Sequence, residues 1–133
     1  MTEIWQWNTA TTATRISTGE ISATEVTQAH LDRLDAVNPA LNAVTNDVRE
    51  EAVETAAALD ATFVASGPIG PLHGVPVTIK ENVDVAGQVT PNGMPVFADL
   101  VAPSDSPLVA HLRAAGAVTI GRTNTPEMSY RWH

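Results

Sequence analysis

Lys80 is the side chain whose type and position in this sequence favour chemistry most clearly. It ends a segment in which apolar Val75, Val77 and Ile79 alternate with other residues, the period of two that is typical of a β-strand. A lysine at such a strand end is ordinarily a charged surface residue. A desolvated lysine, by contrast, loses its proton more readily and can serve as a general base. The spacing favours the surface lysine but does not decide between the two interpretations.

Acidic residues gather in two places. Glu50, Glu51 and Glu54 have the spacing of one solvated helix face. Glu81 and Asp84 flank Lys80 and could pair with it. Two carboxylates that act together as general acid and base need two different environments, which the sequence does not show. The acidic residues therefore predict no catalytic pair.

The four histidines lack the spacing of metal ligands. We expect His30 and His111 at solvent-facing or edge positions of helices, and His73 to make a hydrogen bond that stabilises a glycine-rich loop, while His133 ends the chain. That loop, residues 67–74, has glycines like those of a phosphate-binding loop. A phosphate loop follows a strand and opens a helix, however, whereas this loop follows a predicted helix and opens a strand. Neither metal nor phosphate binding is predicted.

Composition narrows the class of protein. With 133 residues, 44% of them hydrophobic and 17% charged, the chain has the length and character of one soluble globular domain. Seven basic against fifteen acidic residues give a net charge of -8, which disfavours nucleic acid and anionic membranes as partners. The lack of cysteine excludes disulfides, thiolate catalysis and cysteine-bound zinc. No secretory signal or spanning segment is visible, so we expect a cytoplasmic protein.

The elements that must position Lys80 begin with a helical region, residues 1–66. Its predicted helices cover residues 9–18, 22–37 and 47–66. The second begins with a capping box, in which Ser22 and Glu25 can each satisfy a free backbone N–H group. We expect Asn38 and Pro39 to end it, because the residue before a proline avoids helical geometry.

Residues 67–133 are predicted to form the α/β part. In chain order we expect a strand at 75–80, a short extended piece at 83–85, an irregular stretch at 88–102, a helix from 106 and a strand at 117–121. The helix has Ser106 as its N-cap, Pro107 in its first position and Gly116 at its end. Its predicted apolar stripe comprises Leu108, Val109, Leu112 and Ala115. Strand, helix and strand in this order indicate a parallel βαβ unit, and hence the α/β class.

Several segments resemble those of the amidase signature family. The segment that carries the family's lysine is similar to GPLHGVPVTIKENVDVAG, residues 70–87, and the block that follows it is similar to LRAAGAVTIGRTNTPE, residues 112–127. Upstream, residues 19–22 and 38–43 resemble the helical lead-in of the family. The resemblance covers nearly the whole chain, in the family's order and spacing.

This resemblance implies a fold and a chemistry. The fold would have N-terminal helices, residues 1–66, followed by the start of a mixed β-sheet core flanked by helices, residues 67–133, within one domain. In the family a nucleophilic serine, a second serine on a cis peptide and a lysine, matched here by Lys80, hydrolyse carboxamides through an acyl-enzyme. The resemblance implies a small-molecule amide substrate, and no metal or organic cofactor.

The serines of the triad are not found in this sequence. The glycine-serine-rich segment should follow residues 123–127 soon, and the chain ends first. The serines that stand outside a matching context are Ser17, Ser22, Ser66, Ser104, Ser106 and Ser129. Lys80 is therefore the one catalytic residue that we assign, and the 133 residues alone are expected to be inactive. The remainder of the core would come from the same gene product or from a second chain.

Two asparagines and two alternatives complete these expectations. Asn82 and Asn124 match motif positions, and we expect both to hold the strand ends through backbone hydrogen bonds. Within the family, the alternative to an amidase is the amidase-like subunit of a tRNA-dependent amidotransferase, which transfers ammonia instead of releasing it. From another class comes a non-catalytic interaction module. A homodimer is compatible with the sequence.

Overall fold

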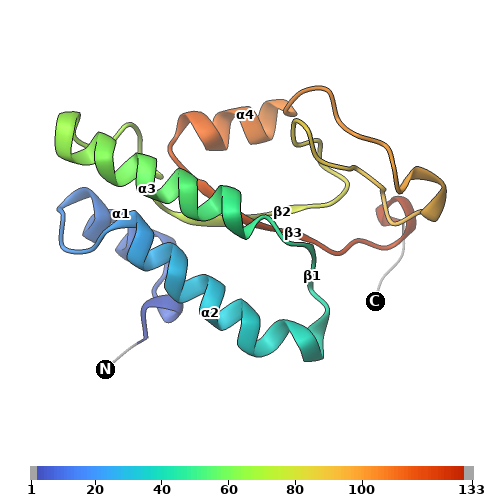
Figure 1. Cartoon of the computed structure of the whole chain (residues 1–133), viewed down its shortest axis with the longest axis horizontal. Coiled ribbons are helices and arrows are strands. Elements are labelled where there is room, and N and C mark those ends of the chain that lie inside the picture. The colour runs from blue at the N-terminus through green and yellow to red at the C-terminus, as the bar shows by residue number, and fades with distance from the viewer. Residues whose placement is uncertain (1–2, 131–133) are drawn as a thin grey trace.

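The computed structural model describes residues 3–130, which form helices packed around a small sheet (Figure 1). The α-helices are α1 (Thr9–Ser17), α2 (Ala23–Leu41), α3 (Arg49–Ser66) and α4 (Pro107–Ala114). The strands are β1 (Val44–Asn46), β2 (Pro76–Lys80) and β3 (Val118–Thr123). Within residues 3–130 there are also three short 3-10 helices, η1 (Ile4–Gln6), η2 (Pro95–Phe97) and η3 (Glu127–Ser129). The predicted α/β class is confirmed.

The sheet has the order β1-β3-β2. β2 and β3 run parallel, as the βαβ pattern predicts, and β1 joins the other side of β3 antiparallel. β1 was not predicted, because it lies within the region expected to be helical. Gly121 explains part of this pairing, because a Cβ atom there would lie 2.6 Å from Val44 Cγ1. The close approach of β1 to β3 thus depends on a residue far away in sequence.

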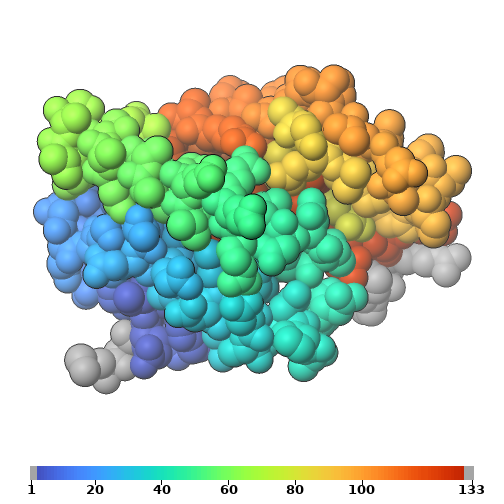
Figure 2. Space-filling view, in the orientation of Figure 1, coloured from blue at the N-terminus to red at the C-terminus, as the bar shows by residue number. Residues whose placement is uncertain are grey.

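The start of α2 is stabilised as predicted. Ser22 Oγ accepts the N–H of Glu25 at 3.1 Å, and the Glu25 carboxylate accepts the N–H of Ser22 at 2.9 Å. A second carboxylate, that of Asp60 in α3, accepts the N–H groups of Ala23 and Thr24 at 2.7 and 3.0 Å. These bonds join the first turn of α2 to α3. Figure 2 shows α3 lying along α2 on this face of the molecule.

The prediction that Asn38 and Pro39 end the second helix was wrong. α2 continues through Pro39 and ends at Leu41, and its C-cap residue Asn42 has a φ of 49°. Beyond the helix, the Asn38 side-chain oxygen accepts the N–H groups of Ala43 and Val44, both at 2.9 Å. A proline in the last turn forfeits one helical hydrogen bond, and the Asn38 side chain stabilises the turn that follows.

Two hydrophobic clusters pack against the sheet. One joins α2 and α3 to β3; its buried members are Ala23, Leu31, Ala52, Ala56, Leu59, Val118 and Ile120. The other joins β2 to α4 through Ile79, Val85 and Val109, with Val77, Val83 and Leu112 at its margin. Figure 1 shows α2 and α4 on opposite sides of the sheet. Burial of these apolar side chains supplies most of the driving force for folding.

Two local predictions in the second half were wrong. Residues 83–85 form no strand; they lie in a loop, and Val85 is apolar because it is buried in the second cluster. The stripe of α4 does not include Leu108, which is 56% exposed, although the adjacent Val109 is buried and Ser106 caps the helix as expected. No helix among residues 3–130 has the length and apolar character needed to cross a membrane.

Candidate active site

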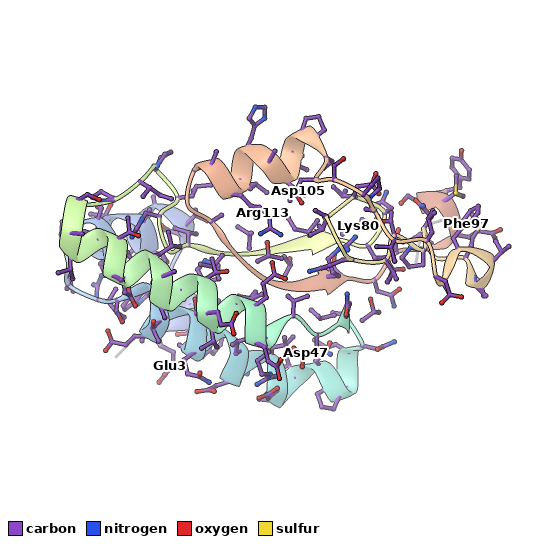
Figure 3. The ribbon with its side chains drawn as sticks, turned by 45° about the horizontal axis from the view of Figure 1, so that its top comes forward. Glu3, Asp47, Lys80, Phe97, Asp105 and Arg113 are labelled. Atoms are coloured by element: carbon purple, nitrogen blue, oxygen red, sulfur yellow. The ribbon has the colours of Figure 1, made fainter. Side chains whose placement is uncertain are left out.

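Lys80 lies at the carboxyl end of β2, where the parallel strand β3 also ends. Its register partner is Thr123, the last residue of β3, and the N–H of Glu81 donates to the carbonyl of Thr123 at 2.9 Å. The Lys80 side chain is exposed, beside the long loop that follows β2 (Figure 3). Lys80 is the only lysine of the 133 residues.

Lys80 forms no ion pair with either acidic neighbour in the part of the chain that the structure describes. The predicted pairing was wrong, and for Glu81 the reason is a contact with a residue far away in sequence. Glu81 accepts a hydrogen bond from the Thr45 hydroxyl of β1 at 2.9 Å, which draws it toward the opposite edge of the sheet.

Asn82 makes a different contact from the one predicted. Its amide donates to Ser129 Oγ at 3.0 Å, and this hydroxyl lies 2.9 Å from Thr125 Oγ1. The bond joins two side chains, not a side chain to the backbone, and it ties the loop after β2 to η3. Met128 and Ser129 have φ values of 48° and 60°, a conformation that few residues other than glycine adopt. Asn82 thus fixes a strained segment close to the end of β2.

Asn124 behaves as predicted. Its backbone N–H donates to the carbonyl of Ala43 at 2.8 Å, and its side-chain amide donates to the carbonyl of Asn42 at 3.3 Å. Both bonds hold the chain after β3 against the turn between α2 and β1. The role of Asn124 among the described residues is structural.

Arg122 is the functional candidate that sequence reasoning missed. Its side chain is fully buried, and its guanidinium donates to the carbonyls of Val83 and Val89 at 2.7 and 3.2 Å. It also donates to Gln88 Oε1 at 3.3 Å and, at the long distance of 3.5 Å, to the carbonyl of Lys80. Burial lowers the pKa of Arg122, and the charges of Glu81 and Asp84 oppose this. The signal that could have identified Arg122 from the sequence is the position of an arginine inside a short apolar strand.

The outer side of the same loop is held by exposed polar contacts. Glu51 of α3 accepts from Gln88 Nε2 and from Arg113 Nη2, each at 3.2 Å. Arg113 also forms an ion pair with Asp105 at 3.1 Å, and the two lie together in Figure 3. Asp105 in turn accepts the N–H of Ala86 at 2.8 Å. Exposed pairs of this kind contribute little stability individually.

The remaining candidates have structural roles. His73 is buried and accepts the N–H of Ile69 at 3.2 Å, which confirms the predicted loop-stabilising bond, whereas His133 lies outside the described residues. The glycine-rich loop follows α3 and precedes β2, the order that argues against phosphate binding. The predicted acidic face of α3 is exposed. No group of three or more potential metal ligands occurs within residues 3–130.

The sequence and fold are similar to those of known amide-processing enzymes. The family model described as Amidase matches residues 25–132. Over 96% of its length the chain is 53% identical to an indoleacetamide hydrolase of Bradyrhizobium diazoefficiens, and over 97% it is 41% identical to one subunit of the glutamyl-tRNA(Gln) amidotransferase of Salinispora tropica. The fold matches that of a fatty acid amide hydrolase with a TM-score of 0.90, at 27% identity over 92% of the chain.

The chain covers only part of each of these proteins. It spans 24% and 26% of the two relatives, and 22% of the chain of the fatty acid amide hydrolase. The described residues therefore correspond to about a quarter of the curated relatives.

Proposed function

This chain belongs to the amidase signature family, and from that premise we propose that the protein hydrolyses the C–N bond of a small carboxamide with Lys80 as its base. The observation that carries the proposal is the position of Lys80. It stands exposed at the carboxyl end of a strand, at the edge where parallel strands commonly present functional groups.

The reaction that we propose is acyl transfer to a serine and then to water. Neutral Lys80 takes a proton from a bridging serine, which takes the proton of the nucleophilic serine as its oxygen attacks the amide carbon. The C–N bond breaks, the amine leaves with a proton returned from the Lys80 ammonium, and an ester to the serine remains. Water hydrolyses that ester to the acid and restores the serine. Both serines would lie outside the 133 residues.

Hydrolysis is the better supported member of two related activities. The identity to the indoleacetamide hydrolase is 53%, against 41% for the amidotransferase subunit, over nearly the same residues. We therefore propose that the amide nitrogen is released rather than passed to a second polypeptide, and that indoleacetamide is the first substrate to assay. Dependence of activity on an aminoacyl-tRNA and a partner protein would favour the amidotransferase instead.

The largest predicted effect on activity is that of Lys80→Ala in the intact protein. Removing a general base costs about 10²- to 10⁴-fold in rate, and we expect a loss of this size in ammonia release. Lys80→Arg keeps the charge but cannot give up a proton at working pH, so it should be equally inactive. Glu54→Gln, on the exposed face of α3, is the matched surface control and should retain activity. Near-normal turnover by folded Lys80→Ala would refute the proposal.

A further inference from the structure

Arg122 is a buried cation that the proposed chemistry does not use. Its side chain is 0% exposed, and among residues 3–130 no carboxylate forms an ion pair with it. All four of its hydrogen-bond acceptors are neutral, and its Nε atom has no partner among the described residues. Burying an unpaired charge is costly, and such arrangements concentrate at functional sites. The groups that the Arg122 guanidinium binds indicate the role of this buried charge.

A β-bulge directs Arg122 to its position. Val77 pairs with Thr119 and Thr78 pairs with Gly121, so Ile120 is an extra residue in β3. Strict alternation from Ile120 would turn Arg122 toward the cluster of α2 and α3, to which Ile120 belongs. The bulge instead pairs it with Ile79, a member of the cluster that includes α4. Bulges commonly re-aim a side chain in this way.

The four acceptors of Arg122 all lie in one stretch of chain, residues 80–89, which begins at Lys80. The shortest bond, 2.7 Å, goes to the carbonyl of Val83, whose own N–H donates to the carbonyl of Lys80 at 3.0 Å. Arg122 thus fixes the turn by which the chain leaves β2. A planar guanidinium with several donors suits this task better than an ammonium, because it reaches several carbonyls in a fixed geometry.

We propose that Arg122 is a positioning residue for Lys80: by binding the carbonyls of residues 80–89 it fixes the direction in which the Lys80 side chain leaves the end of β2. This inference rests on the proposed role of Lys80 as a base. Arg122 contacts neither substrate nor reacting atoms in this scheme. It acts on the rate by limiting where the lysine amine can lie.

The test compares kcat and KM for amide hydrolysis in Arg122→Gln, Arg122→Lys and wild-type intact protein, each at a temperature where circular dichroism shows it folded. Displacing a catalytic group by about 1 Å costs about 10²-fold, so we expect kcat of Arg122→Gln to fall by about that factor with KM within about twofold. Arg122→Lys keeps the charge but loses the planar guanidinium with its several donors. Its kcat should lie between those of Arg122→Gln and wild type. Arg15→Gln removes a half-buried arginine of α1, whose ion-pair partner is the exposed Glu20, and should match wild type.

The outcomes separate this inference from the proposed function. A wild-type kcat in either folded Arg122 variant, with Lys80→Ala inactive, overturns the positioning role alone, whereas active Lys80→Ala overturns both. A kcat that equals that of wild type once it is divided by the measured fraction of folded protein would assign Arg122 to stability alone and also overturn the inference. If Arg122→Gln does not fold, Arg122→Lys decides by itself, because its expected kcat is still below that of wild type.

Discussion

The loop that enters β2, residues 67–75, and the loop that leaves it, residues 81–102, meet the rest of the molecule through different contacts. In the first loop, backbone N–H groups of Leu72 and Gly74 donate to carbonyls of Ala115 and Gly116 at 2.9 and 2.8 Å, and His73 is buried. The second is held by the buried guanidinium of Arg122 and by hydrogen bonds to the side chains of Glu51, Asp105 and Ser129. Dense backbone packing makes the entering loop sensitive to substitution. The leaving loop, by contrast, begins next to the exposed side chain of Lys80.

From this difference we expect the loop that enters β2 to contribute mainly to stability, and the end of β2 at Lys80 to contribute mainly to the reaction. Substitutions in the entering loop should lower the free energy of unfolding and leave the kcat of folded molecules unchanged. At the exit of β2 the opposite is expected for Lys80. Measuring unfolding and turnover on the same variants therefore tests the division directly.

The largest expected loss of stability is that of Gly74→Ala. A Cβ atom there would lie 2.6 Å from the Cβ of Ala23, and the φ of +74° is unfavourable for alanine. Strain and overpacking together should cost about 3 kcal/mol, measured as a shift of the urea midpoint of the intact protein. Gly87→Ala is the matched control, with a φ of +76° and nothing within 4 Å of the added atom. It should cost about 1 kcal/mol; equal losses in both variants would contradict the packing argument.

A smaller effect is expected at the start of α2, beneath Gly74. The hydrogen bond from the Ser22 backbone N–H, and then that from its hydroxyl, lower the pKa of Glu25 from its ordinary value of 4.5. A lowered folded-state pKa stabilises the protein above pH 4.5, and this stabilisation is lost as the pH falls through the folded-state value. Glu25→Gln should therefore lower the urea midpoint at pH 7, and the gap to wild type should narrow below pH 4.5.

The control for this pH effect is Glu54→Gln, whose carboxylate is exposed on α3 and makes no side-chain hydrogen bond among residues 3–130. It should show little difference from wild type at either pH. The difference in urea midpoint between Glu25→Gln and wild type could instead stay constant from pH 7 to pH 3. That result would mean that the negative charge of Glu25 does not contribute to the stabilisation by the capping box.

The smallest change in stability is expected for Lys80→Ala. Because the Lys80 side chain is exposed and forms no ion pair among the described residues, its removal should alter the free energy of unfolding by less than about 0.5 kcal/mol. The same variant should lose amide hydrolysis. A clear loss of stability in the intact protein would show that Lys80 is packed against chain outside residues 3–130, which would sharpen the comparison of the two loops.

Signals within a few residues of one another were predictable from the sequence. The capping box of Ser22 and Glu25, the alternation that ends at Lys80 and the proline start of α4 each depend on local hydrogen bonds or periodicity. They yielded the helices, the parallel strands and the position of Lys80 at a strand end. The motifs around Lys80 indicated the family, because they hold many residues in a fixed order.

Only the tertiary structure decided which distant groups meet. Gly121 permits the close approach of Val44 in β1, and the bulge at Ile120 directs Arg122 toward the loop after Lys80. The Asn82 amide donates to the hydroxyl of Ser129, 47 residues away, and not to a backbone carbonyl as predicted. Strand register, close approach and burial are properties of pairs of segments, and a one-residue shift in register moves a side chain to the other face of a sheet. Local sequence determines where Lys80 stands in its strand, and long-range packing determines what holds it there.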